Sequence, residues 1–435
     1  MQLPRAILAA DRSGAGKTTV TAAVLKRLTK KYKVRGFKAG PDYIDPGYHR
    51  LATGVPSVNL DLWLMGENGV IESLANYGKG FDFGVIEGVM GLYDGAGERF
   101  STYELSRITE TPIILILDVS GMSTTAGAVV KGLIDYRGAK IKGVIFNKVG
   151  SERHYLECLN SLPKGVRSLG YIPRNDRLKV KERHLGLTTV EDNREAQEVI
   201  RIAEESMVLD VEELMSLGED SGELPEPEQT DEPGHVEGLK SEVAAIAYDS
   251  AFSFYYVQNI DSIGRKYKLK FFSPLNDETV EGVDFIYLGG GYPELHLEEL
   301  ERASRTREWI MKSVEDGVKV LGECGGLMFL GRSMSRDGRN YRMVGALDLD
   351  VETRGRLTIG YTELESLSDN LVAESGRLAR GHEFHVSKVI NYEGKPVFRN
   401  RIGKGLGDGY DGLMTQNALG TYSHFNFVRK PKFLS

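Results

Sequence analysis

The sequence has few cysteines, no long apolar run and no excess of positive charge. Only Cys158 and Cys324 occur among 435 residues, too few and too far apart for a disulfide scaffold, which indicates a reducing compartment. The net charge of −7 argues against a nucleic-acid-binding protein. The strongest apolar run, residues 112–119, is far shorter than the roughly 20 residues that span a bilayer. The N-terminus lacks the basic and apolar regions of a signal peptide. We therefore expect a cytoplasmic protein with no nucleic-acid and no membrane partner.

Length and apolar patterning predict two α/β domains. A chain of 435 residues exceeds one ordinary hydrophobic core. Short apolar runs alternate with helical patterns, which predicts a doubly wound parallel sheet with helices on both faces. These runs lie at 6–10, 34–39, 83–88, 112–119, 140–149 and 168–173, and they restart at 242–250, 269–275, 285–291 and 318–326. Between the two sets, residues 218–238 are acidic and rich in Pro and Gly, as in a solvated linker. We predict a first domain at 1–215, a linker at 216–240 and a second domain at 241–435.

The segment AILAADRSGAGKTT, residues 6–19, has the pattern of a phosphate-binding loop. A buried strand leads into a glycine-containing turn, and Lys-Thr then opens a helix whose N-terminus favours anions. Asp11 replaces the first glycine of the usual pattern. Lys17 is expected to reach the β- and γ-phosphates of ATP, and the Thr18 hydroxyl to bind Mg²⁺. The expected ATP-binding residues are Ser13, Gly14, Ala15, Gly16, Lys17 and Thr18, joined by Asn147, which stands at a strand end suited to contact a nucleobase.

Acidic residues follow two of the predicted strands. Glu87 ends the run FDFGVIE, where a second contact to Mg²⁺ belongs, and Asp94 follows seven residues later. The segment GPDYIDPGYH supplies Asp42, Tyr43 and Asp45 on a loop stiffened by Pro and Gly. Each carboxylate taken alone is as often a solvated surface acid. Because all of them lie on loops after strands, we expect Glu87 and Asp45 to bind metal and the other three residues to bind substrate.

Cys324 lies between an apolar strand-like run and a short helical run, in VLGECGGLMFLG. A sharp strand–nucleophile–helix turn exposes a side chain to a cleft, and its flanking glycines suit a strained elbow. Proximity to a helix N-terminus is expected to lower the pKa of the thiol. A lone cysteine is usually buried and inert, which fits Cys158. The LGGGYPE loop offers Gly290 and Gly291 as oxyanion-hole residues, with Gly325 as the second donor.

A cysteine nucleophile needs a base, and three downstream histidines are candidates. His382 and His385 lie in GHEFH, which is one residue short of a zinc helix motif and in an extended strand would place its rings on opposite faces. His424 lies in YSHFNF, near the chain end, where a class I glutaminase keeps its base, so we assign the base to His424. The residue that orients it is left open, because Asn426 stands where such enzymes often have glutamate.

Taken together, these motifs resemble the cobyrinic acid a,c-diamide synthase family, which amidates tetrapyrrole side chains. The resemblance rests on ADRSGAGKTT, KAGPDYIDPGYH, SVNLDLWLM, VIEGVMGLYDG, FIYLGGGYPELH, GECGGLMFLG, RGHEFHVS and YSHFNF, in this order over nearly the whole chain. It implies an N-terminal ATP-dependent synthetase domain and a C-terminal glutamine amidotransferase domain. It also implies that Cys324 is the nucleophile, that His424 is its base, and that the substrates are glutamine and a tetrapyrrole polycarboxylate.

Two other functions share some of these motifs. One is nickel sirohydrochlorin a,c-diamide synthesis for coenzyme F430, within the same family. The other is a partitioning-type ATPase, which shares the altered phosphate loop but leaves Cys324 and LGGGYPE without a role. The oligomeric state is open, with a homodimer as one candidate.

Overall fold

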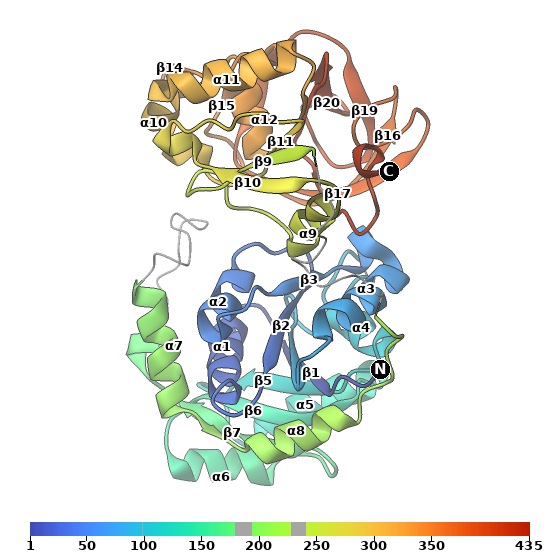
Figure 1. The fold of residues 1–435 in the computed structure, drawn as a ribbon. Helices are drawn as coiled ribbons and strands as arrows, with labels where there is room; N and C mark the ends of the chain where they lie inside the picture. The colour runs from blue at the N-terminus through green and yellow to red at the C-terminus, as the bar shows by residue number, and fades with distance from the viewer. Residues whose placement is uncertain (98, 179–193, 228–240) are drawn as a thin grey trace. The chain divides into compact units, whose positions relative to one another are not determined.

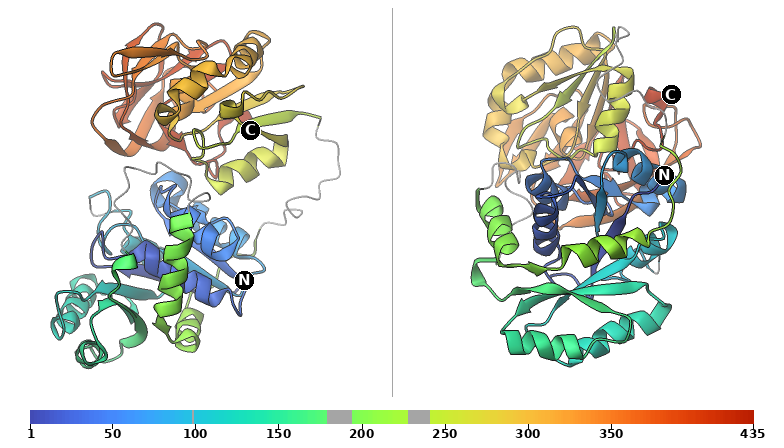
Figure 2. Two further views of the ribbon diagram at one scale, coloured as in Figure 1. Left: turned by 90° about the vertical axis from the view of Figure 1, so that its left-hand side faces the viewer. Right: turned by 60° about the horizontal axis from the view of Figure 1, so that its bottom comes forward.

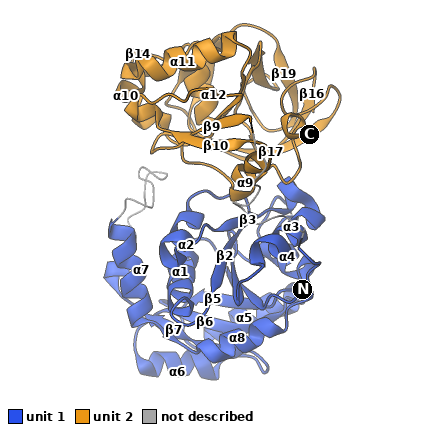
Figure 3. Cartoon of the chain, viewed as in Figure 1, with its two compact units in different colours: residues 1–229 blue, residues 230–435 orange. Residues whose placement is uncertain are grey.

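The chain divides into two compact units, residues 1–229 and 230–435 (Figure 3). The computed structural model describes residues 1–97, 99–178, 194–227 and 241–435. The second half of the expected linker, residues 228–240, lies outside the described residues.

The chain remains packed on the first unit beyond residue 215, where the first domain was expected to end. Helix α8 (Val211–Glu219) covers the start of the expected linker. Beyond it, the Ser221 hydroxyl donates to the Arg5 carbonyl at 2.9 Å, and the Leu224 amide donates to the Met1 carbonyl at 3.0 Å. The segment up to Leu224 is therefore part of the first unit and not a solvated linker.

The first unit contains an eight-stranded sheet in the order β3-β2-β4-β1-β5-β6-β7-β8. Its strands are β1 (Arg5–Ala10), β2 (Val34–Ala39), β3 (Val58–Leu60), β4 (Phe83–Glu87), β5 (Ile113–Asp118), β6 (Ile141–Val149), β7 (Arg167–Pro173) and β8 (Val208–Leu209). All neighbours are parallel except β7 and β8. The strands that come next in the sequence, β2 to β4, all lie on one side of β1, whereas β5 and the later strands lie on its other side. The carboxyl end of β1 is therefore a topological switch point, where α/β sheets bind ligands.

The helices of this unit follow the strands in alternation, as the sequence predicts. They are α1 (Lys17–Leu28), α2 (Asp45–Thr53), α3 (Leu62–Gly78), α4 (Thr102–Ile108), α5 (Thr125–Arg137), α6 (Glu152–Asn160), α7 (Arg194–Ser206) and α8. Helix α1 buries Val20, Val24, Leu25 and Leu28 on one stripe, with the spacing of an amphipathic helix. It packs against α2 and α7, as Figure 1 shows. Every residue of β1, β2 and β5 is buried, which explains why these strands appear as short apolar runs.

The second unit has a ten-stranded sheet in the order β10-β9-β11-β12-β21-β20-β19-β16-β17-β22. Its first half is parallel: β9 (Val243–Ala247), β10 (Lys268–Phe272), β11 (Phe285–Leu288), β12 (Lys319–Glu323) and β21 (Ala418–Thr421). The other half is antiparallel: β16 (Thr358–Ser366), β17 (Leu378–His385), β19 (Pro396–Ile402), β20 (Tyr410–Thr415) and β22 (His424–Phe425). A smaller sheet contains β13 (Ser333–Arg336), β14 (Arg339–Arg342), β15 (Leu349–Glu352) and β18 (Lys388–Tyr392).

The helices of the second unit are α9 (Val257–Lys266), α10 (Leu297–Arg302), α11 (Ser304–Glu315) and α12 (Gly325–Leu330). Both units can be followed from two further directions in Figure 2. Among the described residues, no helix combines the length and the apolar character that crossing a lipid bilayer requires.

Candidate active sites

The predicted phosphate loop connects β1 to α1 at the switch point of the first sheet. Ser13 to Gly16 form the turn, in which Gly14 and Gly16 have φ angles of 77° and 90°. A Cβ atom on Gly16 would lie 2.4 Å from Asn147 Nδ2, so this position accepts only glycine. Asn147 Nδ2 donates to the Ala15 carbonyl at 2.9 Å and thus holds the loop against β6. A contact between Asn147 and a nucleobase stays a prediction.

Lys17 and Thr18 begin α1 and point toward the end of β4. Lys17 Nζ donates to the Met90 carbonyl at 2.6 Å, and Thr18 Oγ1 donates to Glu87 Oε1 at 2.8 Å. Burial, together with the charge of Lys38 nearby, lowers the pKa of Lys17. The structure thus brings together three residues that the sequence assigned to one nucleotide site.

Glu87 ends β4 and has no exposed surface. Its Oε2 is hydrogen-bonded to His49 Nε2 at 2.7 Å, and its Oε1 lies 3.4 Å from Lys38 Nζ as well as next to Thr18. His49 Nδ1 in turn lies 2.9 Å from Ser57 Oγ. The sequence analysis did not single out Lys38 or His49. A signal for Lys38 was available, because a lysine within a wholly buried strand needs charged partners.

Lys38 connects Glu87 to the loop before α2. Its Nζ lies 2.8 Å from Asp45 Oδ2 and 3.9 Å from Asp42 Oδ2, and it donates to the Gly88 carbonyl at 2.9 Å. Burial alone would lower the pKa of Lys38, but Asp45 and Glu87 raise it above its ordinary value, so this side chain stays charged. Asp45, expected to bind metal, therefore has a lysine partner in the structure.

The three residues expected to bind substrate lie on two loops of the first unit. Asp42 Oδ1 accepts hydrogen bonds from the amides of Ile44 at 2.7 Å and Asp45 at 3.0 Å, so part of its role is to shape the start of α2. Tyr43 lies in the same loop and is half-buried. Asp94 lies after β4, and its Oδ2 accepts from the Gly91 amide at 3.0 Å. No contact of these residues identifies a ligand, so their substrate role stays a prediction.

The oxygens of Thr18 and Glu87 fit a magnesium ion. Among the described residues, no group of three or more His, Cys, Asp or Glu is arranged to hold a metal. Mg²⁺ does not need such a group, because in nucleotide sites it takes one or two protein oxygens and completes its shell with phosphate and water. The hydroxyl of Thr18 and a carboxylate oxygen of Glu87, 2.8 Å apart, are donors of this kind.

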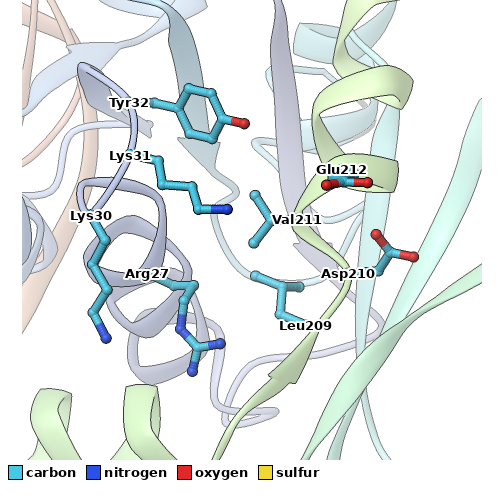
Figure 4. Close-up of a pocket in the computed structure, with 8 residues that line it drawn as sticks. All are labelled: Arg27, Lys30, Lys31, Tyr32, Leu209, Asp210, Val211 and Glu212. Carbon is cyan, nitrogen blue, oxygen red and sulfur yellow. The ribbon is translucent and has the colours of Figure 1, made fainter.

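A cavity of about 390 Å³ lies at the opposite end of α1 from the phosphate loop (Figure 4). Its lining residues are Arg27, Lys30, Lys31, Tyr32, Leu209, Asp210, Val211 and Glu212. Helix α1 has 12 residues, which places this cavity about 18 Å from Lys17 at ~1.5 Å per residue. Glu204 forms ion pairs with Arg27 and Lys30. The cavity is therefore separate from the nucleotide site, and much of its positive charge is already neutralised.

Cys324 occupies the sharp turn between β12 and α12 in the second unit. Its φ and ψ angles are 51° and −100°, which a non-glycine residue rarely adopts. The Cys324 amide donates to the Thr421 carbonyl at 2.7 Å, and its Sγ lies 3.6 Å from the Phe384 carbonyl. A Cβ on Gly326 would lie 2.0 Å from the Leu288 carbonyl oxygen. The predicted strand–cysteine–helix elbow is thus present, and its glycine is required by close packing.

The electrostatic prediction for Cys324 is wrong in direction. Its thiol is 3% exposed, and burial raises the pKa of Cys324, with the nearby carboxylates of Glu294 and Glu323 acting in the same direction. The helix that follows has only six residues, and its dipole does not offset these contributions. These surroundings favour the neutral thiol, so the predicted nucleophilic role of Cys324 would require a base.

The loop after β11 lies against both the elbow and His424. A Cβ on Gly325 would lie 3.3 Å from the Gly291 amide nitrogen, so these two backbone segments are close neighbours. A Cβ on Gly290 would lie 2.3 Å from His424 Cε1. The Gly290 carbonyl accepts from the amides of Ser253 and Phe254, both at 3.0 Å, which fixes the orientation of this loop. The three glycines meet as the oxyanion-hole hypothesis requires, and the role itself stays a prediction.

His424 is fully buried in β22, directly across from His382 in β17. The two rings stack with centroids 4.9 Å apart. Burial, with His382 and His385 nearby, lowers the pKa of His424, which favours the neutral imidazole. His385 stacks on Tyr422 instead, so the rings of His382 and His385 face different neighbours, as expected for an extended segment.

Asp411 fixes the segment that leads into His424, and the sequence analysis missed it. Its Oδ2 accepts from the hydroxyls of Thr421 at 2.7 Å and Ser423 at 3.0 Å, and its Oδ1 accepts from the Tyr422 amide at 3.1 Å. The carbonyl of Thr421 is the acceptor of the Cys324 amide. One buried carboxylate therefore connects the Cys324 elbow to the strand that carries His424.

Comparison with known proteins identifies the family of each unit. Residues 6–187 match a family described as the CobQ/CobB/MinD/ParA nucleotide binding domain, and residues 243–432 match the CobB/CobQ-like glutamine amidotransferase domain. The cobyrinate a,c-diamide synthase of Saccharolobus solfataricus is 52% identical over 98% of each chain. The enzyme of that name from Sulfolobus acidocaldarius is 51% identical over 100% of each chain. The one from Methanocaldococcus jannaschii is 37% identical over 100% of this chain and 98% of its own. The chain belongs to the cobyrinate a,c-diamide synthase family.

Proposed function

We propose that this chain amidates the a- and c-side-chain carboxylates of cobyrinate, using ATP and ammonia released from glutamine, in cobalamin biosynthesis. The observation that carries the proposal is that one chain holds both a phosphate loop, with Lys17 beside Thr18 and Thr18 in contact with Glu87, and a strained cysteine elbow whose neighbouring glycine loop also lies against a buried histidine. The relatives named cobyrinate a,c-diamide synthase match it end to end. We also propose that the protein is cytoplasmic.

In the second unit, the proposed reaction is glutamine hydrolysis. His424 takes the proton of the Cys324 thiol as sulfur attacks the side-chain amide carbon of glutamine, and the proton passes to the departing ammonia. The amides of Gly291 and Gly325 would stabilise the oxyanion. Water then cleaves the thioester and releases glutamate. Because burial raises the pKa of Cys324, the thiol would need this proton transfer to attack as a thiolate.

In the first unit, the proposed reaction activates a carboxylate of the tetrapyrrole. The substrate oxygen attacks the γ-phosphorus of ATP, forming an acyl phosphate and ADP, and ammonia then displaces phosphate to leave the amide. Lys17 lies where it can offset negative charge on the phosphoryl group. Thr18 and Glu87 would hold Mg²⁺, which supplies charge neutralisation at the phosphates when bound. Lys38 keeps the carboxylates of Asp45 and Glu87 in fixed positions.

The test is the mass of the product after incubation with cobyrinate, ATP and glutamine. We expect two acid-to-amide conversions, with glutamate, ADP and phosphate formed in step. Nickel sirohydrochlorin offered in parallel should be left unchanged. Amidation of that compound alone would overturn the substrate assignment while keeping the chemistry.

Replacing Glu87 with glutamine should raise the Mg²⁺ concentration needed for ATP turnover and leave glutamine hydrolysis largely intact. The amide keeps the shape but loses the charge that a divalent cation requires. Titration of ATP turnover with Mg²⁺ measures the effect, and Glu72→Gln, an exposed carboxylate on α3, is the matched control. Normal turnover with an unchanged Mg²⁺ requirement would make Glu87 structural.

A homodimer is a further part of the proposal. Sedimentation equilibrium of the full chain measures it, and a single species of monomer mass at all concentrations would contradict it.

A further inference from the structure

The orienter of the catalytic histidine is the part of the glutaminase site that motif reasoning leaves open. Asn426 stands two residues after His424, but its Oδ1 accepts from the Val428 amide at 3.0 Å. Its side chain is therefore used to close a turn of its own segment. The structure assigns the orienting role to Glu323, the residue immediately before the nucleophile.

Glu323 ends β12 and is 1% exposed. Its Oε2 lies 3.9 Å from His424 Nδ1, and its Oε1 accepts a hydrogen bond from the Phe425 amide at 3.1 Å. One carboxyl group therefore contacts both the ring of His424 and the backbone directly after it. With Nδ1 turned toward Glu323, Nε2 is the ring nitrogen that would take the proton of Cys324 in the proposed reaction.

The carboxyl group of Glu323 is itself held in place. Tyr287 donates its hydroxyl to Oε2 at 2.7 Å. Asn259 donates to the Tyr287 oxygen at 3.3 Å and to the Phe425 carbonyl at 2.8 Å. This set of side chains comes from β11, α9 and β12, three elements of one unit, so the position of Glu323 does not depend on a single contact.

The carboxyl group of Glu323 can respond to a partner that becomes cationic during the reaction. While His424 is neutral, burial raises the pKa of Glu323 to about 8. When His424 takes the thiol proton, an imidazolium lies 3.9 Å from Oε2, and attraction in a buried site favours the carboxylate form. Glu323 is thus a positioning residue that acts through His424 and does not touch the substrate.

This inference rests on the proposed glutaminase function of the second unit. The variant that tests it is Glu323→Gln, with glutamate release, the KM for glutamine and ammonia-driven amidation all measured. We expect kcat for glutamine hydrolysis to fall roughly 10- to 100-fold, a part of the ~10²–10⁴ that a positioned base contributes. The KM for glutamine and the rate of ammonia-driven amidation should both stay near the values of the unchanged chain, since neither glutamine binding nor amidation by free ammonia uses His424.

A double-mutant cycle separates orientation from general damage. In a chain that already carries His424→Ala, adding Glu323→Gln should cause little further loss, because its effect passes through the missing ring. Glu363→Gln is the matched control, as Glu363 is another β-strand glutamate of this unit and is paired with Arg380 at 3.1 Å. The thermal midpoint of each variant verifies folding. If Glu323→Gln does not fold, Tyr287→Phe tests the same chain of contacts, with a smaller expected loss of kcat.

The possible results distinguish the two hypotheses. If the unchanged chain releases no glutamate from glutamine, the proposed function fails and this inference fails with it. If the unchanged chain is active and Glu323→Gln matches it, or if the two substitutions lower kcat by independent factors, the orienting role of Glu323 is overturned while the glutaminase function stands.

Discussion

Cys324→Ser is expected to lose synthesis from glutamine and to keep synthesis from ammonium salts at elevated pH. A serine hydroxyl has a far higher pKa than a thiol and would be a poor nucleophile at this elbow. Glutamine-driven amidation should therefore fall by roughly 10³-fold or more, the scale seen when a nucleophile is removed. Free ammonia bypasses the step, since the ATP site uses only the ammonia that hydrolysis supplies. His424→Ala should give the same pattern.

Amide product and ATP turnover, each measured with glutamine and with ammonium chloride, test this expectation. Cys158→Ala is the matched control, because Cys158 is the other cysteine of the chain and is buried in α6 of the first unit. Retention of glutamine-driven synthesis by Cys324→Ser would show that the thiol is not the nucleophile. Loss of the ammonia-driven reaction in a folded variant would refute the two-site scheme.

Lys17→Ala should abolish amidation from either nitrogen source. Lys17 is the first residue of α1, where phosphate would bind. Alanine removes its ammonium group and with it the charge stabilisation of the phosphoryl group. A loss of about 10²–10³-fold is expected, as when one electrostatic donor of a transition state is removed. Glutamine hydrolysis, which uses residues of the other unit, should continue without coupled amide formation.

The control for Lys17→Ala is Lys26→Ala, which removes the same charge from an exposed position of the same helix. Amide formation with ammonium chloride and glutamate release with glutamine are compared in both variants. Full amidation by Lys17→Ala would remove the synthetase assignment from the first unit.

The parts of the fold that the sequence predicted well are the buried parallel strands. Strands such as β1 and β5 are buried on both faces and apolar at nearly every position, so they appear as continuous runs bounded by turns. Apart from the extended segments around His382 and His424, the antiparallel half of the second sheet was not predicted. Strands such as β16 (TIGYTELES) and β19 (PVFRNRI) are polar and partly exposed, because only one face is covered, and they give no comparable signal.

The residues of the candidate sites were also predicted unevenly from the sequence. The loops that carry Lys17 and Cys324 were predicted because each needs glycines at fixed spacing. Lys38 and Glu323 were missed as functional residues, since their partners come from segments distant in sequence. The direction of the Cys324 pKa shift was mispredicted because a helix N-terminus is a local feature, whereas burial among carboxylates is set by the whole unit.

The backbone of Cys324 also has a consequence for how the sequence can change. Holding a non-glycine residue at φ 51° and ψ −100° costs about 1–3 kcal/mol, a sizeable fraction of the ~5–15 kcal/mol by which a typical domain is stable. Glycine at this position would relieve that strain but remove the sulfur. Selection for stability alone would therefore favour replacement of Cys324 by glycine. Only a continued demand for glutamine as the nitrogen donor would retain the cysteine, the proposed nucleophile.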